Sequence, residues 1–314
     1  MPIFILRRLL ALIPVVLVMS IVVFLIIYLI PGDPARVMLG DGADESTIQE
    51  LREQMGLDYP LVEQYGRWMW HAIQGDLGRS FFLQQPVSTA IAEHLAPTLS
   101  LAILAQFIAV LIAIPLGVRA AVNRGGIADK VLNAYSLLGI SVPGFLLSLF
   151  FVLIFAVKLR WLPVSGYVPL QDGLGTFLRY MFLPSLSIGI VMSSLTARIV
   201  KASMLEVLNE GFVKTAWSKG LHPNKIIYKH VFRNALIPVL TVIGGSFGTL
   251  VAGAAVIESI FNIPGLGQML VHAVERRDYA VIQGMVLFIA IVYVAVNLIV
   301  DLMYAIVDPR IRLQ

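Results

Sequence analysis

The stretch KTAWSKGLHPNKIIYKHVFRNALIP, residues 214–238, is rich in Lys, His and Arg, although the chain around it is 58% hydrophobic. Long apolar runs flank it on both sides. Charged residues make up only 13% of the 314 residues, against about 25% in an ordinary soluble domain. So little charge cannot coat a water-facing surface, and lipid is therefore the expected solvent. The basic stretch then needs a place outside the lipid.

Six apolar runs are each long enough to cross a bilayer core of about 30 Å as a helix, which satisfies its own backbone polar groups. The first run is too long for the apolar part of a secretory signal peptide, so we expect it to be retained. The sequence therefore predicts an all-α membrane protein with six transmembrane helices. The predicted spans are 9–30, 95–118, 131–157, 182–200, 236–260 and 281–307.

Lys and Arg set the predicted orientation, because they gather on the cytoplasmic side of membrane proteins. With the N-terminus in the cytoplasm, the inside segments hold fourteen of the 23 Lys and Arg residues but only four of the 19 acidic ones. Both termini and the basic stretch are then cytoplasmic. One interpretation of the stretch is a polybasic loop that only obeys this rule and touches anionic lipid. Its internal pattern favours another.

Two breakers frame a short helix in this region. The fourth span is expected to continue as a helix and to end at 209–211, and a helix is expected over 212–219. Gly220 suits the positive φ of a helix stop, and Pro223 separates the short helix from the helix that leads into the fifth span. A short helix held between two turns fits a groove on another protein, whereas a loop that meets only lipid headgroups needs no such turns. The apolar side of the helix consists of Phe212, Val213, Ala216 and Trp217.

These residues resemble the cytoplasmic EAA loop of ABC importer permeases, in the version of the dipeptide, oligopeptide and nickel branch. The sequence departs from the general EAA pattern at Lys214-Thr215, where Glu-Ala is usual, and at Arg233, near a usual Pro. The matches in the loop are Thr215-Ala216, Lys219-Gly220-Leu221, His230 and Arg233-Asn234-Ala235-Leu236-Ile237-Pro238. Further motifs of the branch follow in order along the chain: Pro31-Gly32-Asp33-Pro34, Gly75-Asp76-Leu77-Gly78 with Ser80, residues 202–208, Pro264-Gly265-Leu266-Gly267, Arg277-Asp278-Tyr279 with Gln283-Gly284, and residues 308–312.

The resemblance implies the type I ABC importer permease architecture, in which the short helix is a coupling helix that docks on an ATP-binding subunit. This chain contains no G-x-x-x-x-G-K-[ST] phosphate-binding loop. ATP and Mg are therefore expected on partner subunits, and this chain is expected to hold no cofactor or metal and to be no enzyme. The residues assigned to ATPase coupling are Glu210, Gly211, Phe212, Lys214, Thr215, Ala216, Trp217 and Gly220.

The resemblance also implies an assembly in the bacterial cytoplasmic (inner) membrane. Its other members are a second, homologous permease that makes a heterodimer, two ATP-binding subunits and an extracytoplasmic solute-binding protein; no nucleic acid is expected. Dipeptides and oligopeptides are the expected cargo, with nickel complexes or glutathione as alternatives. A stand-alone channel would need a selectivity filter and an intramembrane enzyme would need paired catalytic groups, and the sequence offers neither.

The loop after the first span is soluble in character, with a small helical content. One helix is expected after a Ser46 cap and a second is expected to open near Pro60. The second is expected to lie on the membrane surface or against neighbouring spans, with contact to a solute-binding protein as the alternative. The predicted parts of the chain are the N-terminus with the first helix (1–30), the extracytoplasmic amphipathic segment (31–94), the permease core (95–307) with its coupling loop (201–235), and a cytoplasmic tail (308–314).

Small and polar residues within the spans invite separate predictions. Asn297 and Asp301 share a helix face and are expected to form an internal hydrogen-bond network, with a substrate site as the alternative. Glu258 lies near the outer end of the fifth span and is expected to reach water. A helix-packing set recurs every fourth residue, for packing within the chain or against the second permease, and consists of Gly244, Gly248 and Ala252.

Overall fold

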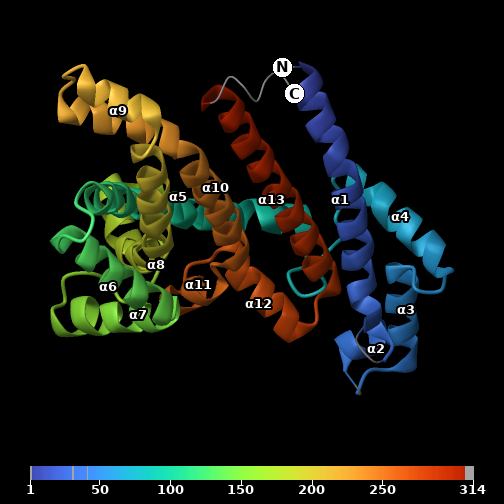
Figure 1. Cartoon of the computed structure of the whole chain (residues 1–314). Coiled ribbons are helices and arrows are strands. Elements are labelled where there is room, and N and C mark those ends of the chain that lie inside the picture. The colour runs from blue at the N-terminus through green and yellow to red at the C-terminus, as the bar shows by residue number, and fades with distance from the viewer. Residues whose placement is uncertain (1, 30–31, 41, 308–314) are drawn as a thin grey trace. The chain divides into compact units, whose positions relative to one another are not determined.

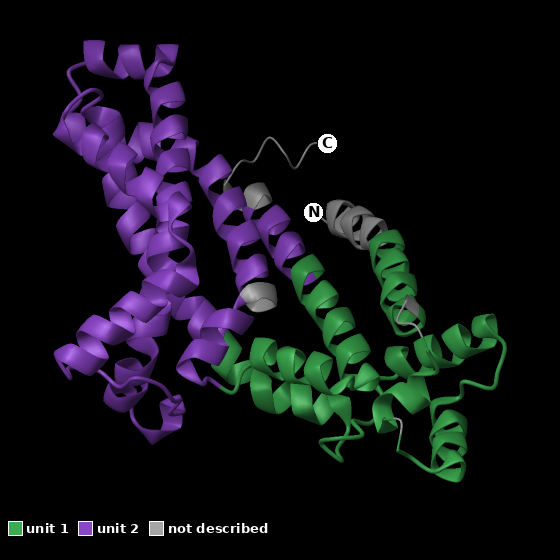
Figure 2. Cartoon of the chain, turned by 90° about the horizontal axis from the view of Figure 1, so that it is seen from below, with its two compact units in different colours: residues 1–98, 264–294 green, residues 99–263, 295–314 purple. Residues whose placement is uncertain are grey.

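The computed structural model describes residues 2–29, 32–40 and 42–307, and the predicted cytoplasmic tail, 308–314, lies outside the described residues (Figure 1). Within these ranges the regular structure is helical, and the one β pairing is an isolated bridge between Arg79 and Pro86. The predicted all-α class is confirmed. The chain forms two compact units, residues 1–98 with 264–294 and residues 99–263 with 295–314 (Figure 2).

The first unit combines segments from both ends of the chain. It contains α1 (Pro2–Leu29), α2 (Pro34–Leu39), α3 (Glu45–Met55), α4 (Leu61–Ile73), the start of α5 (Val87–Val122), α12 (Leu266–Arg276) and the start of α13 (Tyr279–Val307).

Buried apolar residues of α5, α12 and α13 hold this unit together. The Leu266 N–H at the start of α12 donates to Thr98 Oγ1 of α5 over 2.8 Å. Gln283 Nε2 of α13 donates to the Phe24 carbonyl of α1 over 3.1 Å, which ties α1 to the same group. The cluster consists of Val87, Ala90, Ile91, Leu266, Met269, Ala273, Val281, Ile282 and Met285.

The two helices predicted after the first span are both present. α4 starts directly after Pro60, as predicted. The predicted Ser46 cap is wrong, because α3 already begins at Glu45 and Asp44 holds the extended N-cap backbone, with φ −65° and ψ 141°. The first helical hydrogen bond of α3 runs from the Ile48 N–H to the Asp44 carbonyl over 3.1 Å.

The second unit contains the remaining helices. They are the rest of α5, α6 (Ile127–Ser141), α7 (Gly144–Phe151), the π-helix η1 (Val152–Lys158), the 3-10 helix η2 (Leu170–Asp172), α8 (Leu174–Leu208), α9 (Gly211–Ser218), the π-helix η3 (Lys225–Phe232), α10 (Arg233–Gly253), α11 (Ala255–Phe261) and the end of α13.

The long helix α8 is the centre of the second unit and packs against α6, α7 and α10. Its close approach to α6 requires Gly139, because a Cβ there would lie 1.8 Å from Ser194 Oγ. Polar contacts accompany this approach. The Tyr135 hydroxyl donates to the Ile190 carbonyl, and Ser136 Oγ donates to the Ser194 carbonyl, each over 3.1 Å.

By length and composition, four described helical stretches can cross a membrane. They are Val87–Val122, Leu174–Leu208, Lys225–Leu250 and Tyr279–Met303. The bent pair of α6 with α7 and η1 raises this number to five, and Ile13–Tyr28 of α1 is a shorter apolar segment. The count of six spans therefore stays a prediction.

Two predicted spans are not single straight helices. The run 131–157 is interrupted at Val142, whose φ of −90° and ψ of 119° are extended, and the helices on its two sides are bent by 99°. Pro143 accounts for the break, because a proline ring disfavours the helical conformation of the residue before it. The run 236–260 is divided at Ala254, whose ψ of −2° separates α10 from α11.

Candidate functional site

The predicted coupling helix is present as α9, one residue earlier than expected. Two hydrogen bonds close its C-terminus, from the Gly220 N–H to the Trp217 carbonyl over 2.9 Å and from the Leu221 N–H to the Ala216 carbonyl over 3.3 Å. This is the Schellman pattern, which needs a left-handed residue after the last helical turn. Gly220 provides it with a φ of +69°. The predicted helix stop is therefore confirmed together with its cause.

The middle of the apolar side of α9 is buried in the core of its own unit. Val213 and Ala216 are 1% and 7% exposed and pack with residues of α5, α8, η3 and α10. The π-helix η3 contributes Ile226 and Val231 to the same core. Because a π-helix bonds residues five apart, these two side chains lie on one face. α9 is thus fixed to its unit through its own apolar side chains.

The two aromatic residues of α9 remain exposed at the edges of this buried side. Phe212 is 45% exposed and Trp217 is 48% exposed. Five positions on an α-helix correspond to about 140° around its axis, so the two rings flank the buried pair on opposite sides. The prediction of one apolar patch of four exposed residues is wrong, because the chain covers its centre. Two separate aromatic edges remain.

The other residues predicted to couple to an ATPase lie on the exposed surface around α9. Thr215 Oγ1 donates to the Gly211 carbonyl and Ser218 Oγ donates to the Lys214 carbonyl, each over 3.1 Å. Glu210 occupies the N-cap position with an extended backbone and makes no side-chain cap hydrogen bond. The exposed members of the predicted set are Glu210, Gly211, Phe212, Lys214, Thr215, Trp217 and Gly220.

Sequence reasoning missed an ion pair that joins α6 to α8 in the same unit. Lys201 Nζ donates to Asp129 Oδ1, and the Gly125 N–H donates to Asp129 Oδ2 over 2.9 Å. The Asp129 and Lys201 side chains are only 11% and 19% exposed. The signal in the sequence was the isolation of Asp129, one of few acids in segments otherwise rich in Lys and Arg.

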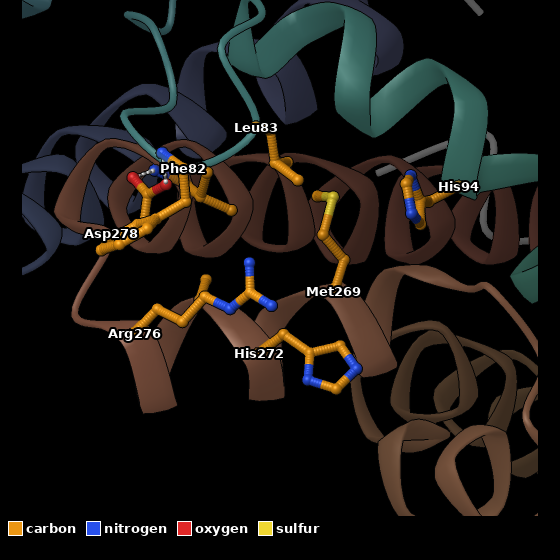
Figure 3. A pocket seen from close by; sticks show the side chains of 9 residues that line it. Phe82, Leu83, His94, Met269, His272, Arg276 and Asp278 are labelled. Atoms are coloured by element: carbon orange, nitrogen blue, oxygen red, sulfur yellow. Dashed lines mark hydrogen bonds between the residues drawn. The ribbon is translucent and has the colours of Figure 1, made fainter.

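The first unit carries a pocket of about 150 Å³ beside α12. Figure 3 shows Met269 and Arg276 of α12 on one side of it and Phe82, from the loop between α4 and α5, on the other. The loop is held by Ser80 Oγ, which donates to Asp278 Oδ2 over 2.5 Å, and both side chains are buried. Two motifs that are 198 positions apart in the sequence therefore meet at this pocket. Among the described residues, no group of three His, Asp or Glu side chains could hold a metal ion.

The structure places the small residues of the fifth span individually. A Cβ on Gly244 would lie 2.0 Å from Val300 Cγ2, so α10 and α13 approach closely at this point. Gly248 is buried. The side chain of Ala252 lies outside the described part of the chain. Close approach within the chain is therefore observed at Gly244.

The polar residues predicted within the last two spans are buried or half-buried. Glu258 is 0% exposed, so the expectation that it reaches water is wrong. It belongs to α11, which packs against α7 and α8, and the Gly166 N–H donates to the Phe261 carbonyl at the end of α11 over 2.7 Å. Asn297 and Asp301 are both half-buried on α13, and their predicted hydrogen-bond network stays a prediction.

Two family models match nearly the whole sequence. The model described as "Binding-protein-dependent transport system inner membrane component" matches residues 113–313. The chain belongs to this family. The model of the N-terminal part, described as "Binding-prot-dependent transport system membrane comp, N-term", matches residues 1–102. This permease is therefore a multi-pass protein of the inner membrane and a subunit of an ABC importer.

Full-length relatives agree with this assignment. The permease is 45% identical over 308 residues to a putative peptide transport system permease protein of Brucella abortus (strain 2308), which covers 98% of each chain. It is 39% identical to a probable peptide ABC transporter permease protein of Sinorhizobium fredii, covering 99% of this chain and 100% of that one. It is 42% identical to the glutathione transport system permease protein GsiC of Salmonella paratyphi A, over 98% of each chain.

A solved structure supports the fold. The permease resembles a chain of the MetNI methionine ABC transporter in an inward-facing conformation, with a TM-score of 0.56 and 20% sequence identity. The similarity covers 69% of this chain and 96% of that chain. At this identity the likeness concerns the architecture alone.

Proposed function

We propose that this permease forms half of the translocation path of an ATP-driven importer for short peptides and is itself no enzyme. A second permease provides the other half, and an extracytoplasmic solute-binding protein delivers the cargo. Of the two ATP-binding subunits, one docks at α9 and the other docks at the second permease. Both termini and α9 then face the cytoplasm, in agreement with the distribution of Lys and Arg.

The geometry of α9 is the observation that carries this proposal. Val213 and Ala216 anchor the helix in the core of its unit, while Phe212 and Trp217 project from its two edges. Exposed aromatic residues on a fixed helix are the residue type that dominates protein interfaces. The buried side chains of α9 hold it against α8 and α10. A force applied to the exposed side of α9 therefore moves these helices together with it.

The cargo assignment rests on the curated relatives. Permeases named for peptide transport are 39% and 45% identical to this chain over nearly its full length. The glutathione permease is 42% identical, and glutathione is itself a short peptide. Uptake of labelled dipeptide, oligopeptide, glutathione and nickel by cells that express the complete importer distinguishes these cargoes. Dipeptide or oligopeptide uptake that unlabelled glutathione and nickel do not reduce is the expected result.

The docking role of α9 is tested by Phe212→Ala and Trp217→Ala in the complete importer. Loss of an interface aromatic anchor costs about 2 kcal/mol or more, which is about 30-fold in affinity. We expect the amount of ATP-binding subunit that copurifies and the rate of uptake to fall together. Ser218→Ala is the matched control, because Ser218 is exposed on the side of α9 opposite Val213 and Ala216. Wild-type copurification and uptake in both aromatic variants would overturn the docking role.

A further inference from the structure

The helix α4 packs one side against α1, and both belong to the first unit (Figure 1). Tyr65 and Trp68 place their rings 5.4 and 5.9 Å from the ring of Phe24, measured between centroids. The hydroxyls of Tyr65 and Ser20 are 2.9 Å apart, and the Tyr28 hydroxyl donates to Gln64. These contacts account for one side of α4 only.

A second side of α4 is apolar and has no partner in the described structure. Val62 is 83% exposed, Ile73 is 72% exposed and Trp70 is 64% exposed. They lie eight and eleven positions apart on a helix, so they share one broad face. Trp70 is the residue type that gathers at the boundary between lipid and water.

The charged residues of α4 lie along the edge of this apolar face, beside Trp70, and partner one another. Arg67 Nη2 donates to Glu63 Oε1 over 2.7 Å, and the Arg67 guanidinium lies 3.9 Å from the centroid of the Tyr59 ring. His71 follows at the same spacing of four residues. Glu63 and Arg67 therefore neutralise each other, and this pair offers little net charge to attract a partner protein. An apolar arc beside a narrow charged stripe is the pattern of a helix that lies in a membrane interface.

The depth of α4 along α1 agrees with such a location. Phe24, which contacts α4, lies five residues before Leu29, the last residue of α1. Five residues of helix span about 7.5 Å. Interfacial helices bury their apolar face about 5–10 Å into the boundary between headgroups and acyl chains. The exposed apolar surface of α1 continues from there toward its N-terminus, with Val22 51% and Val18 56% exposed.

We propose that α4 lies in the membrane interface, with Val62 and Ile73 in contact with lipid acyl chains, Trp70 at the boundary with the headgroups and Arg67 turned to water. The occupant of the exposed apolar face is therefore lipid and not another protein. The orientation given under Proposed function places this helix in the outer leaflet, whereas its location in an interface does not depend on that orientation. α4 then attaches the first unit to the membrane in addition to α1.

The absence of cysteine from the chain permits a direct test. Single substitutions Val62→Cys, Ile73→Cys, Glu63→Cys and Arg67→Cys in the full-length chain, assembled in its importer and placed in liposomes, carry a nitroxide spin label. Molecular oxygen concentrates in lipid and a nickel chelate stays in water, so the ratio of their collision rates reports the surroundings of each label. Val18→Cys on α1 provides the lipid reference.

We expect the oxygen-to-nickel ratio at positions 62 and 73 to exceed that at positions 63 and 67 on the order of tenfold, and to approach the reference at position 18. Equal ratios at all four positions of α4 would place the helix in water and overturn the proposal. Low access of both reagents at positions 62 and 73 would show that protein covers the face, which would overturn it as well. Neither result depends on whether α9 docks an ATPase, so failure here leaves the proposed function intact.

Discussion

Two short amphipathic helices of this permease, α9 and α4, solve the same packing problem differently. α9 buries the centre of its apolar side, with Val213 and Ala216 almost fully enclosed. α4 has no buried residue and is held to α1 by aromatic edges and hydroxyl contacts. The comparison teaches that similar sequence patterns do not imply similar anchorage. α9 is fixed by its buried side chains, whereas α4 makes few protein contacts and relies, in our proposal, on contact with lipid.

The largest effect is expected from Val213→Asp, which tests the anchorage of α9 directly. The change places a charge in an enclosed apolar site and is expected to cost about 3 kcal/mol or more in the free energy of unfolding. The melting temperature of the detergent-solubilised complex measures it. Ser218→Asp adds the same charge to an exposed position of the same helix and is expected to leave the melting temperature unchanged. Equal melting temperatures for the two variants would contradict the buried position of Val213.

An intermediate effect is expected from Gly220→Ala, which tests the C-terminal stop of α9. At a φ of +69° an alanine pays the steric cost of the left-handed region, about 1–2 kcal/mol. Gly211→Ala is the control, because a Cβ at Gly211 meets nothing within 4 Å and its φ is not positive. Thermal unfolding and limited proteolysis at the connection after α9 measure the difference. If Gly211→Ala destabilised the protein as much as Gly220→Ala, the left-handed conformation would not be the cause.

The smallest effect is expected from Tyr65→Phe on α4. It removes the hydroxyl contact with Ser20 and keeps the ring on Phe24, at a cost of about 0.5–1.5 kcal/mol. Hydrogen exchange of the α4 amides measures the local opening, which we expect to increase while global melting changes little. Tyr228→Phe, at an exposed position of η3, serves as the control. A fall in global stability as large as that of Val213→Asp would remove the contrast between the two helices.

The sequence predicted the elements that depend on local chemistry. Pro60 marked the start of α4 and Gly220 marked the end of α9, because proline and glycine restrict or permit backbone conformations by themselves. The bend before Pro143 was foreseeable on the same ground, although the hydrophobic run across it favoured one straight span. The N-terminus of α3 was misplaced by two residues, since Asp44 and Ser46 are both good capping residues.

Other features depend on contacts that no local pattern contains. The burial of Val213 and Ala216 requires the neighbouring helices, so the sequence overestimated the exposed apolar surface of α9. Glu258 looked close to water because its position along the span was known, but the packing of α7 and α8 against α11 was not. The meeting of Ser80 with Asp278 joins distant motifs, and sequence order alone does not say which of them touch.

The unbroken course of α8 determines how far a small movement at α9 can reach. The helix runs through 35 residues from Leu174 to Leu208 and remains helical across Pro184, a length of about 52 Å. If α8 tilts by about 5° about one end, the other end is displaced by about 4.5 Å, which is more than the roughly 2.8 Å diameter of a water molecule. This amplification requires no flexible hinge within α8. It requires only that the end of α8 next to α9 is firmly attached to α9.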